Sequence, residues 1–277
     1  MFSIRSCVIS SIGKNRDNHE DNFVFAGRVF LREDDPRTPD VNCKDLIVSE
    51  CYQTLSDIYA VFDGIGGYDY GEMASEISAE NLIRHRNELL NDQDGCIDRF
   101  QQYIEDTNRL LIDFSKKNHC IPNIGTTISA LILFENIFYV FNLGDSRIYR
   151  YNEEGLFQIT RDHNERIRSI ELFGNITYPD IFAERLTRHL GIDIPGMKVK
   201  ADAVEMDYSY NKEFFILCTD GFYKSISDDI LSKTLNRCFV SDTLVDTATE
   251  LVKEASEKSE DNITLILLSV ERHEDDE

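Results

Sequence analysis

The chain lacks long hydrophobic runs, and proline is scarce. Its 277 residues contain five prolines and 14 glycines, which are spread out rather than gathered into a linker or a low-complexity tract. The longest apolar runs have the length of strands, far below the roughly 20 residues that a membrane helix needs, and no signal peptide is visible at the N-terminus. We therefore expect one domain over residues 1–270, a charged tail over residues 271–277, and no membrane partner.

Positive charge is also in short supply. The sequence has 29 Lys and Arg residues against 51 Asp and Glu residues, which gives a formal net charge of −22. Nucleic acids and anionic membranes are bound through basic surfaces, so the composition argues against both as partners. For most of the acidic residues we expect a role in solubility.

The seven cysteines are irregularly spaced, and no two of them form a Cys-x-x-Cys motif. An odd number without such a motif argues against a zinc ribbon. Reduced thiols are typical of the cytosol, so we expect a cytoplasmic protein. Cys218 lies within an apolar run and is expected to pack in the core.

Short runs rich in β-branched and aromatic residues predict the strands. We expect strands at residues 4–10, 22–31, 57–62, 127–134, 137–143, 146–151, 214–219 and 263–270. The charged stretch 32–55, which contains Pro36 and Pro39, predicts a surface loop. The polar stretch 162–190 has no clear period and predicts an irregular surface segment.

Apolar residues at helical spacing predict three helices. Two lie at residues 70–90 and 97–115, and the third covers the apolar positions from Leu244 to Ala255, with Ser241 and Asp242 as candidate N-caps. The strands come in antiparallel blocks and the helices come singly or as a pair, which favours an α+β fold over a parallel sheet. Two packed sheets with helices outside would bury both kinds of apolar face.

Several acidic residues that are far apart in the sequence stand at the ends of predicted strands. Glu20 and Asp21 precede one strand, Asp63 and Asp220 each follow one, and Asp261 shortly precedes the last. A carboxylate at the tip of a buried strand is costly unless a positive group meets it. We therefore expect a shared cation site with oxygen ligands, which suits Mg²⁺ or Mn²⁺.

Eight short motifs follow one another from Gly13 to Thr264. They are Gly13-x-x-Arg16-x-x-His19-Glu20-Asp21, Val61-Phe62-Asp63-Gly64-Ile65-Gly66-Gly67, Gly125-Thr126-Thr127, Gly144-Asp145-Ser146-Arg147-x-Tyr149, Thr160-x-Asp162-His163, Leu186-Thr187-Arg188-His189-Leu190-Gly191, Cys218-Thr219-Asp220-Gly221 and Asp261-Asn262-Ile263-Thr264. In this order they resemble the metal-dependent serine/threonine protein phosphatases of the protein phosphatase 2C (PPM) family. The resemblance covers nearly the whole chain, although each motif alone is weak.

The resemblance implies an αββα sandwich of two antiparallel sheets flanked by helices. It also implies hydrolysis of phosphoserine or phosphothreonine at a centre of two Mg²⁺ or Mn²⁺ ions. Asp63 would bridge the two ions, Glu20 and the carbonyl of Gly64 would complete the ligands of one, and Asp220 and Asp261 would serve the other. The substrates would be phosphorylated proteins, and a cognate serine/threonine kinase is a candidate partner.

The resemblance assigns roles to three more residues. Asp21 would accept a hydrogen bond from metal-bound water. Asp145, together with Asp220, corresponds to a third and weaker metal site of related bacterial enzymes. Arg16 suits the phosphate oxygens of the substrate because its planar guanidinium can donate two hydrogen bonds at once. Arg16 and Asp63 are thus the expected catalytic residues.

The chain departs from the family pattern at two positions. Ile65 stands where many eukaryotic relatives have a histidine and bacterial relatives commonly have a methionine, so the chain resembles the bacterial branch. The leaving group must then take its proton from water or from another group. His19 stands where the family usually has asparagine, and we expect a structural role for it. Residues 162–190 correspond to the family's variable flap beside the active site.

Two other functions remain open at this point. The chain could be a catalytically inactive relative that acts as a binding or regulatory module, but such proteins usually lose metal carboxylates, and here Glu20, Asp63, Asp220 and Asp261 are all present. It could also be an acidic calcium-binding scaffold, although the sequence has no EF-hand loop.

Overall fold

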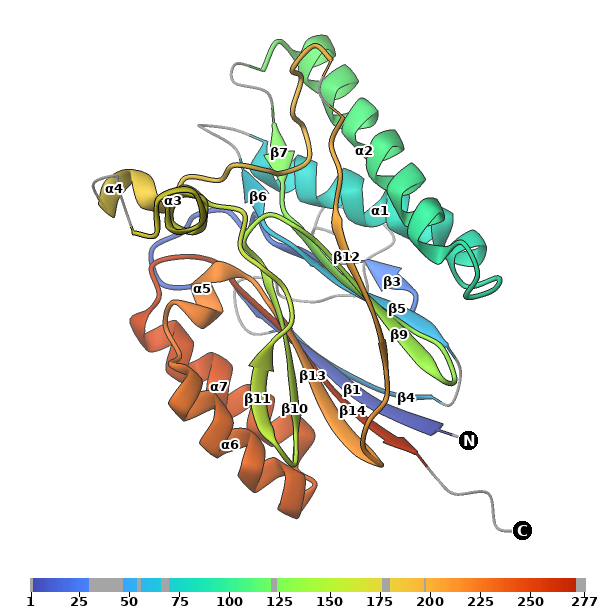
Figure 1. Cartoon of the computed structure of the whole chain (residues 1–277). Coiled ribbons are helices and arrows are strands. Elements are labelled where there is room, and N and C mark those ends of the chain that lie inside the picture. Colours follow the sequence, from blue (N-terminus) through green and yellow to red (C-terminus); the bar gives the residue numbers. More distant parts are fainter. Residues whose placement is uncertain are drawn as a thin grey trace.

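The computed structural model describes residues 2–29, 47–53, 56–65, 70–120, 124–175, 180–196 and 198–272. In these residues two six-stranded sheets lie face to face, and helices cover their outer faces (Figure 1). All strand pairs within the two sheets are antiparallel. The predicted α+β sandwich is therefore confirmed.

The first sheet joins the two ends of the chain. Its strands, in spatial order, are β11 (Gly155–Gln158), β10 (Arg147–Asn152), β13 (Lys212–Cys218), β14 (Ile263–Arg272), β1 (Phe2–Ser11) and β4 (Ile47–Gln53). The register of β1 against β14 runs from Phe2 opposite Arg272 to Ser11 opposite Ile263. The residues that follow β1 and those that precede β14 therefore emerge together at one rim of the sandwich.

The second sheet is built from the middle of the chain. Its strands, in spatial order, are β12 (Asp202–Asp207), β9 (Ile137–Leu143), β8 (Ile128–Leu133), β5 (Asp57–Phe62), β2 (Asn22–Phe25) and β3 (Arg28–Val29). A short ribbon of β6 (Gly64–Ile65) and β7 (Gly125–Thr126) extends beyond it. This ribbon places the backbone after Asp63 beside the strand that opens the Gly-Thr-Thr motif.

Helices cover each sheet from outside (Figure 1). The second sheet carries α1 (Gly71–Leu89) and α2 (Cys96–Asn118), and the first carries α6 (Asp228–Ser241) and α7 (Leu244–Lys258). Three apolar layers result: one under each helix pair, and one between the sheets that contains Tyr59, Phe138 and Phe215. The shorter α3 (Glu165–Phe173), α4 (Asp180–Ala183) and α5 (Asp220–Tyr223) lie toward the rim where β13 ends.

Some predicted strand boundaries were wrong. The strand expected at 22–31 ends at Phe25, turns through Ala26 and Gly27, and returns as β3, while residues 30 and 31 lie outside the described residues. The loop expected at 32–55 contains β4, which pairs with β1, and its other residues lie outside the described ones. The final strand runs on to Arg272, so the first two residues of the predicted tail belong to it.

Other elements were not predicted because their sequence patterns are short. The segment 162–190 contains α3, whose first turn is capped by the Asn164 side chain accepting from Ile167 N at 3.0 Å. The strands β11 and β12 and the helix α6 were not predicted. The N-caps expected for the last helix were also wrong, because Ser241 ends α6, Asp242 is its left-handed C-cap with φ 58°, and Thr243 is the N-cap of α7.

Within the described ranges, no helix combines the length and the apolar character that crossing a membrane requires.

A buried ion pair links two strands of the first sheet. Arg150 on β10 and Glu213 on β13 are 7% and 1% exposed, and Arg150 Nε donates to Glu213 Oε2 at 3.2 Å. Glu213 Oε1 also accepts from Ser209 N at 3.1 Å and Tyr210 N at 3.0 Å. One carboxylate thus satisfies a buried cation and the turn that leads into β13. Removing it would leave the guanidinium without a counter-charge and the two turn N–H groups without this acceptor.

We expect Glu213→Ala to lower the free energy of unfolding by about 3–5 kcal/mol, because it leaves an uncompensated buried guanidinium. Urea unfolding followed by circular dichroism measures this. The control is Glu250→Ala, which removes an exposed partner of Arg237 and should cost less than about 1 kcal/mol. Equal losses in the two variants would contradict the importance given to burial.

Candidate active site

The predicted acidic residues meet at one rim of the sandwich. Glu20 and Asp21 precede β2, Asp63 joins β5 to β6, Asp220 begins α5, and Asp261 precedes β14. Asp145, in the turn from β9 to β10, joins them. The Asp63 carboxylate lies within electrostatic range of four of the others, namely Asp220, Asp21, Asp145 and Asp261.

Crowding of these carboxylates changes their protonation. Burial raises the pKa of Asp63 well above its usual range, and the charges of Asp220 and Asp21 raise it further. Burial also raises the pKa of Asp21 to about 8 and that of Asp145 to about 7, with Asp220 contributing to both. Each shift has the sign expected when burial and neighbouring carboxylates disfavour the charged form. A divalent ion among them would remove the repulsion.

Hydroxyl and amide groups hold the acidic residues in place. Asp21 Oδ2 accepts hydrogen bonds from Thr219 Oγ1 and Thr264 Oγ1, each at 2.8 Å. The Asn262 side chain accepts from Glu20 N at 2.7 Å and donates to Ile12 O at 2.8 Å. The sequence motifs contain these three residues, but their roles as supports depend on contacts between distant segments and were not predicted.

The Gly-Thr-Thr motif supports the backbone at Asp63. Thr126 Oγ1 donates to Asp63 O at 2.8 Å, Thr127 N donates to the same oxygen at 2.9 Å, and Asp63 N donates to Thr127 Oγ1 at 3.0 Å. Beside it, Gly64 N donates to Glu20 O at 3.2 Å. A Cβ on Gly64 would lie 2.2 Å from Gly71 O and 2.6 Å from Glu20 O, so only glycine fits there.

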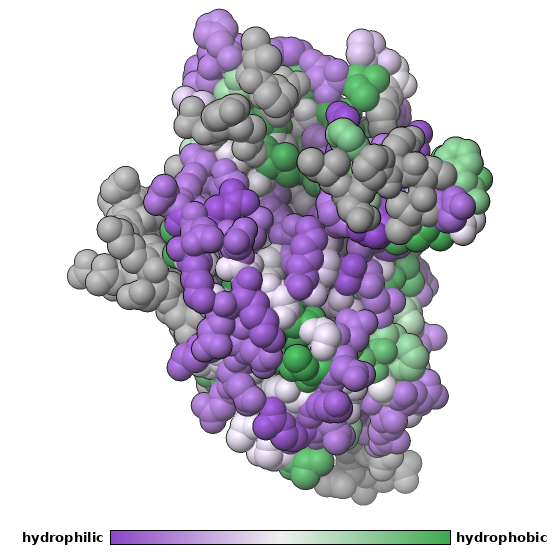
Figure 2. All heavy atoms as spheres, turned by 90° about the vertical axis from the view of Figure 1, so that its left-hand side faces the viewer, coloured by the Kyte–Doolittle hydropathy of each residue, from purple (hydrophilic) through white to green (hydrophobic). Residues whose placement is uncertain are grey.

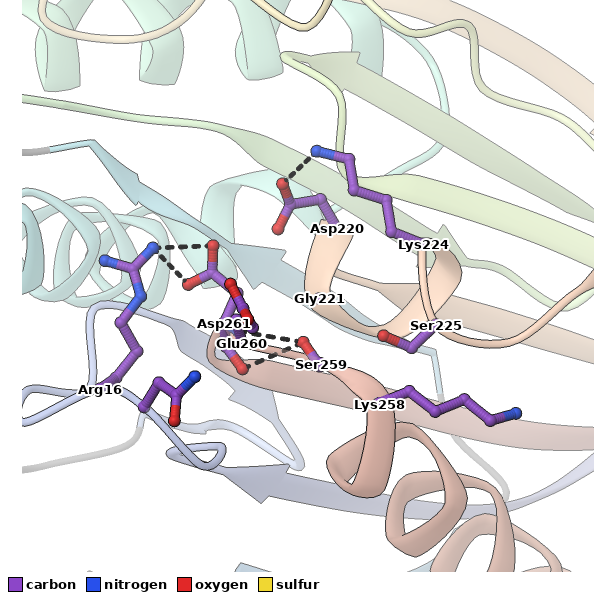
Figure 3. Close-up of a pocket in the computed structure, with 10 residues that line it drawn as sticks. Arg16, Asp220, Gly221, Lys224, Ser225, Lys258, Ser259, Glu260 and Asp261 are labelled. Carbon is purple, nitrogen blue, oxygen red and sulfur yellow. Dashed lines mark hydrogen bonds and ion pairs between the residues drawn. The ribbon is translucent and has the colours of Figure 1, made fainter. Parts of the chain in front are cut away.

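The carboxylate and carbonyl oxygens of the cluster are suitable ligands for a hard divalent cation, but two of the carboxylates form ion pairs with side-chain cations. Among the described residues, no three His, Cys, Asp or Glu side chains already form a group able to hold a metal ion. Instead, Asp261 pairs with Arg16 and Asp220 pairs with Lys224 (Figure 3). Since the ligands are all oxygens and repel one another, the residues fit Mg²⁺ or Mn²⁺. A metal ion at Asp261 would compete with Arg16, which contacts both oxygens of that carboxylate, whereas Lys224 contacts only Oδ2 of Asp220.

Arg16 stands at the mouth of a pocket beside these residues. Its Nη2 lies 2.7 Å from Asp261 Oδ1, its Nη1 lies 3.9 Å from Glu20 Oε2, and its side chain is 43% exposed. The pocket has a volume of about 610 Å³ and lies between the Arg16 loop, α5 and the turn before β14 (Figure 3). Its lining residues are Asn15, Arg16, Asp220, Gly221, Lys224, Ser225, Lys258, Ser259, Glu260 and Asp261.

The molecular surface around this region is polar. The side of the molecule that bears α3, α4 and α5 is covered mainly by hydrophilic residues, with smaller apolar areas between them (Figure 2). Such a surface suits a charged substrate better than an apolar one.

His19 lies next to the candidate ligands but points into the sheet. Its Nε2 lies 3.0 Å from Ser10 Oγ on β1, and burial lowers its pKa to about 4. The imidazole is therefore neutral at physiological pH. This contact fits the structural role that was expected for it.

The predicted flap is anchored to the turn that carries Asp145. His163 Nδ1 accepts from Gly144 N at 3.0 Å, and His163 Nε2 lies 2.9 Å from Asp202 Oδ2. Arg188 Nη2 donates to Asp202 Oδ1 at 2.9 Å. His163 Nε2 also lies 2.9 Å from Arg188 Nη1, so His163, Arg188 and Asp202 form one polar cluster. These contacts fix the base of the flap.

A second anchor lies on the other side of the turn. Arg147 donates to both oxygens of Asp162, at 2.9 and 2.7 Å. Its guanidinium also lies 3.6 Å from the centre of the Tyr223 ring on α5. The bidentate pair therefore connects β10, the flap and α5 around the acidic cluster.

Comparison with known proteins agrees with the fold and identifies the family. Residues 43–263 match the protein phosphatase 2C family. The serine/threonine phosphatase stp of Listeria monocytogenes is 27% identical over 219 residues, which cover 76% of this chain and 83% of that protein.

Solved structures share the architecture. Serine/threonine phosphatase Stp1 from Staphylococcus aureus is 24% identical with a TM-score of 0.77, and the match covers 96% of this chain and 95% of that one. The catalytic domain of PstP, solved with two manganese ions, is 21% identical with a TM-score of 0.73, and the match covers 98% and 100%.

The family match spans well over half of the sequence, so the chain belongs to the protein phosphatase 2C family. It is a metal-dependent protein-serine/threonine phosphatase, and the bacterial proteins that it resembles confirm the predicted branch.

The contribution of His163 to stability should depend on pH. Burial is the main cause that lowers its pKa in the folded chain, so below the unfolded value of about 6.5 the unfolded chain takes up the proton first. The stability that wild type has relative to His163→Asn should therefore be full above about pH 7 and shrink as the pH falls toward 5.5. Urea unfolding of both proteins across this range measures the difference, and a difference that grows toward low pH would contradict it.

Proposed function

We propose that this phosphatase hydrolyses phosphoserine and phosphothreonine at a two-metal centre, with Asp63 between the ions. The observation that carries the proposal is the position of Asp63, whose carboxylate lies among four other acidic side chains that raise its pKa. When bound, two divalent ions would neutralise the phosphate dianion and activate a water between them for in-line attack.

Each acidic residue would have its own place in this centre. Glu20 and the carbonyl of Gly64 would serve one ion, and Asp220 and Asp261 would serve the other. The backbone contact between Gly64 and Glu20 supports the first assignment. Asp21 would remain beside the ions as a hydrogen-bond acceptor, because Thr219 and Thr264 already hold one of its oxygens.

The cofactor would be Mg²⁺ or Mn²⁺, since both prefer oxygen ligands. The related PstP domain was crystallised with two manganese ions, which supports the same count here. All the candidate ligands in this chain are carboxylate or carbonyl oxygens, with no thiolate or imidazole among them.

The substrates would be phosphorylated proteins, and a serine/threonine kinase with the same targets is a candidate partner. Arg16 supports this proposal because a guanidinium at the mouth of a pocket can bind two phosphate oxygens. The polar surface near α3, α4 and α5 (Figure 2) suits a charged segment of a folded or extended protein.

We also propose a single catalytic domain over residues 1–270, with a flap at residues 162–190.

We further propose a cytoplasmic location for the protein. Four cysteines in the described part of the chain have free thiols: Cys96, Cys120, Cys218 and Cys238. Free thiols are typical of reducing compartments.

We expect Asp220→Asn to lower turnover of p-nitrophenyl phosphate with Mn²⁺ by more than about 100-fold, the upper range for losing a group that only supports a metal ligand. The matched control is Asp229→Asn, which removes a carboxylate that is 92% exposed on α6 and should change turnover little.

Two outcomes of this assay would favour other functions. A wild-type protein as inactive as Asp220→Asn would favour a regulatory module without catalysis. Uptake of Ca²⁺ without turnover in Mn²⁺ or Mg²⁺ would favour a calcium-binding scaffold.

We expect Arg16→Ala to raise KM for the aryl phosphate by about 10-fold or more, because hydrogen bonds to charged groups contribute about 1.5–3 kcal/mol. Mn²⁺ affinity should stay equal or become tighter, since Arg16 no longer competes for Asp261. Steady-state kinetics and calorimetric titration measure the two effects.

Arg16→Lys is the control for this prediction, because it keeps the charge but loses the planar fork. It should recover part of the loss in KM. A collapse of Mn²⁺ affinity in Arg16→Ala would contradict the assignment of Arg16 to the phosphate.

A further inference from the structure

Lys224 brings a side-chain cation into the acidic cluster. It follows Asp220 by one helical turn, and its Nζ lies 2.7 Å from Asp220 Oδ2. The same Nζ lies 3.8 Å from Glu184 Oε2, in the segment after α4. The close-up view shows the Lys224 side chain directed toward the Asp220 carboxylate (Figure 3). Two acidic groups from separate parts of the chain thus share one ammonium.

The charge of Lys224 also acts on Asp145. Burial and the charge of Asp220 raise the pKa of Asp145, whereas Lys224 lowers it. In turn, burial lowers the pKa of Lys224, but Asp220 and Asp145 raise it above its ordinary value. The Lys224 ammonium thus lies within electrostatic range of both Asp145 and Asp220.

This pair differs from an ordinary surface ion pair at helical spacing. Asp229 and Lys233 on α6 have the same i, i+4 spacing, but their side chains are 92% and 80% exposed and their charges lie 4.0 Å apart. The side chains of Asp220 and Lys224 are 18% and 41% exposed. Exposed pairs contribute little because water screens them. A pair inside a carboxylate cluster interacts more strongly.

We propose that Lys224 is a built-in cation that occupies the corner between Asp145 and Asp220, so that no further divalent ion binds there. The inference rests on the proposed two-metal function and sets its ion count at two. Lys224 contacts Oδ2 of Asp220, which leaves Oδ1 for a metal of the main pair. An ammonium tethered to α5 neutralises this corner at any concentration of free metal.

The ion pair with Glu184, at 3.8 Å, adds a second acidic neighbour to Lys224. Glu184 also pairs with Arg166 of α3, whose Nη2 lies 2.8 Å from Glu184 Oε1. The chain of charges runs from Arg166 through Glu184 and Lys224 to Asp220. It connects the flap to the acidic cluster and holds the ammonium on the Asp220 side of α5.

Counting bound ions tests this proposal. Wild type, Lys224→Gln and Lys224→Met are dialysed against saturating Mn²⁺, and the metal per chain is measured by mass spectrometry. Wild type should hold two ions, and both variants should hold one more. Adding Asp145→Asn to Lys224→Gln should remove the extra ion, because that residue supplies half of the corner.

The matched control is Lys258→Gln. Lys258 lines the same pocket, but its Nζ pairs with Glu254 of α7. This variant loses the same charge without touching the Asp145 and Asp220 corner, so it should hold two ions like wild type. Lys224→Arg, which keeps a cation, should also hold two.

The outcomes separate this inference from the function on which it rests. Three ions in wild type, or two ions in both Lys224→Gln and Lys224→Met, would overturn the role of Lys224 and leave the phosphatase proposal intact. A wild-type protein that binds no Mn²⁺ and has no turnover would overturn the two-metal function and this inference together.

Discussion

Repulsion between carboxylates at close range sets the requirements for the rest of this protein. Asp63 lies among four other acidic side chains, and burial weakens the solvent screening that would otherwise separate their charges. The chain offsets this repulsion with hydroxyl donors at Asp21 and with the cations Arg16 and Lys224. Such a cluster of oxygen groups has the chemistry that suits a divalent cation.

The two-sheet architecture brings the cluster together. Pairing of β1 with β14 over their full length places the loop that carries Arg16 and Glu20 beside the turn at Asp261. Asn262 then ties the two by hydrogen bonds to Glu20 N and Ile12 O. On the opposite sheet, the ribbon of β6 and β7 fixes the backbone of Asp63. Each acidic residue stands where a regular strand ends, so rigid elements position groups that the connecting turns expose.

Sequence patterns identified the parts with strong local signals. The apolar runs of β5, β8, β9, β13 and β14 were found within a few residues, and so were α1 and α2. The strand β4 was missed because the charged residues around it resemble a loop, and its pairing with β1 is a long-range contact. The helix α5 has only four residues, too few for a periodic pattern. Because that helix was not predicted, there was no reason in the sequence to expect the side chains of Asp220 and Lys224, four residues apart, to lie side by side.

The sequence by itself determined the chemistry of the donor set and the class of fold. Oxygen-bearing side chains at strand ends, and the order of eight motifs, are local properties that need no coordinates to be recognised. Only the tertiary structure decided which cation meets which carboxylate: Arg16 meets Asp261, and Lys224 meets Asp220 and Glu184. Electrostatic energy depends on distance through space and on burial, and neither quantity follows from the separation of two residues along the chain.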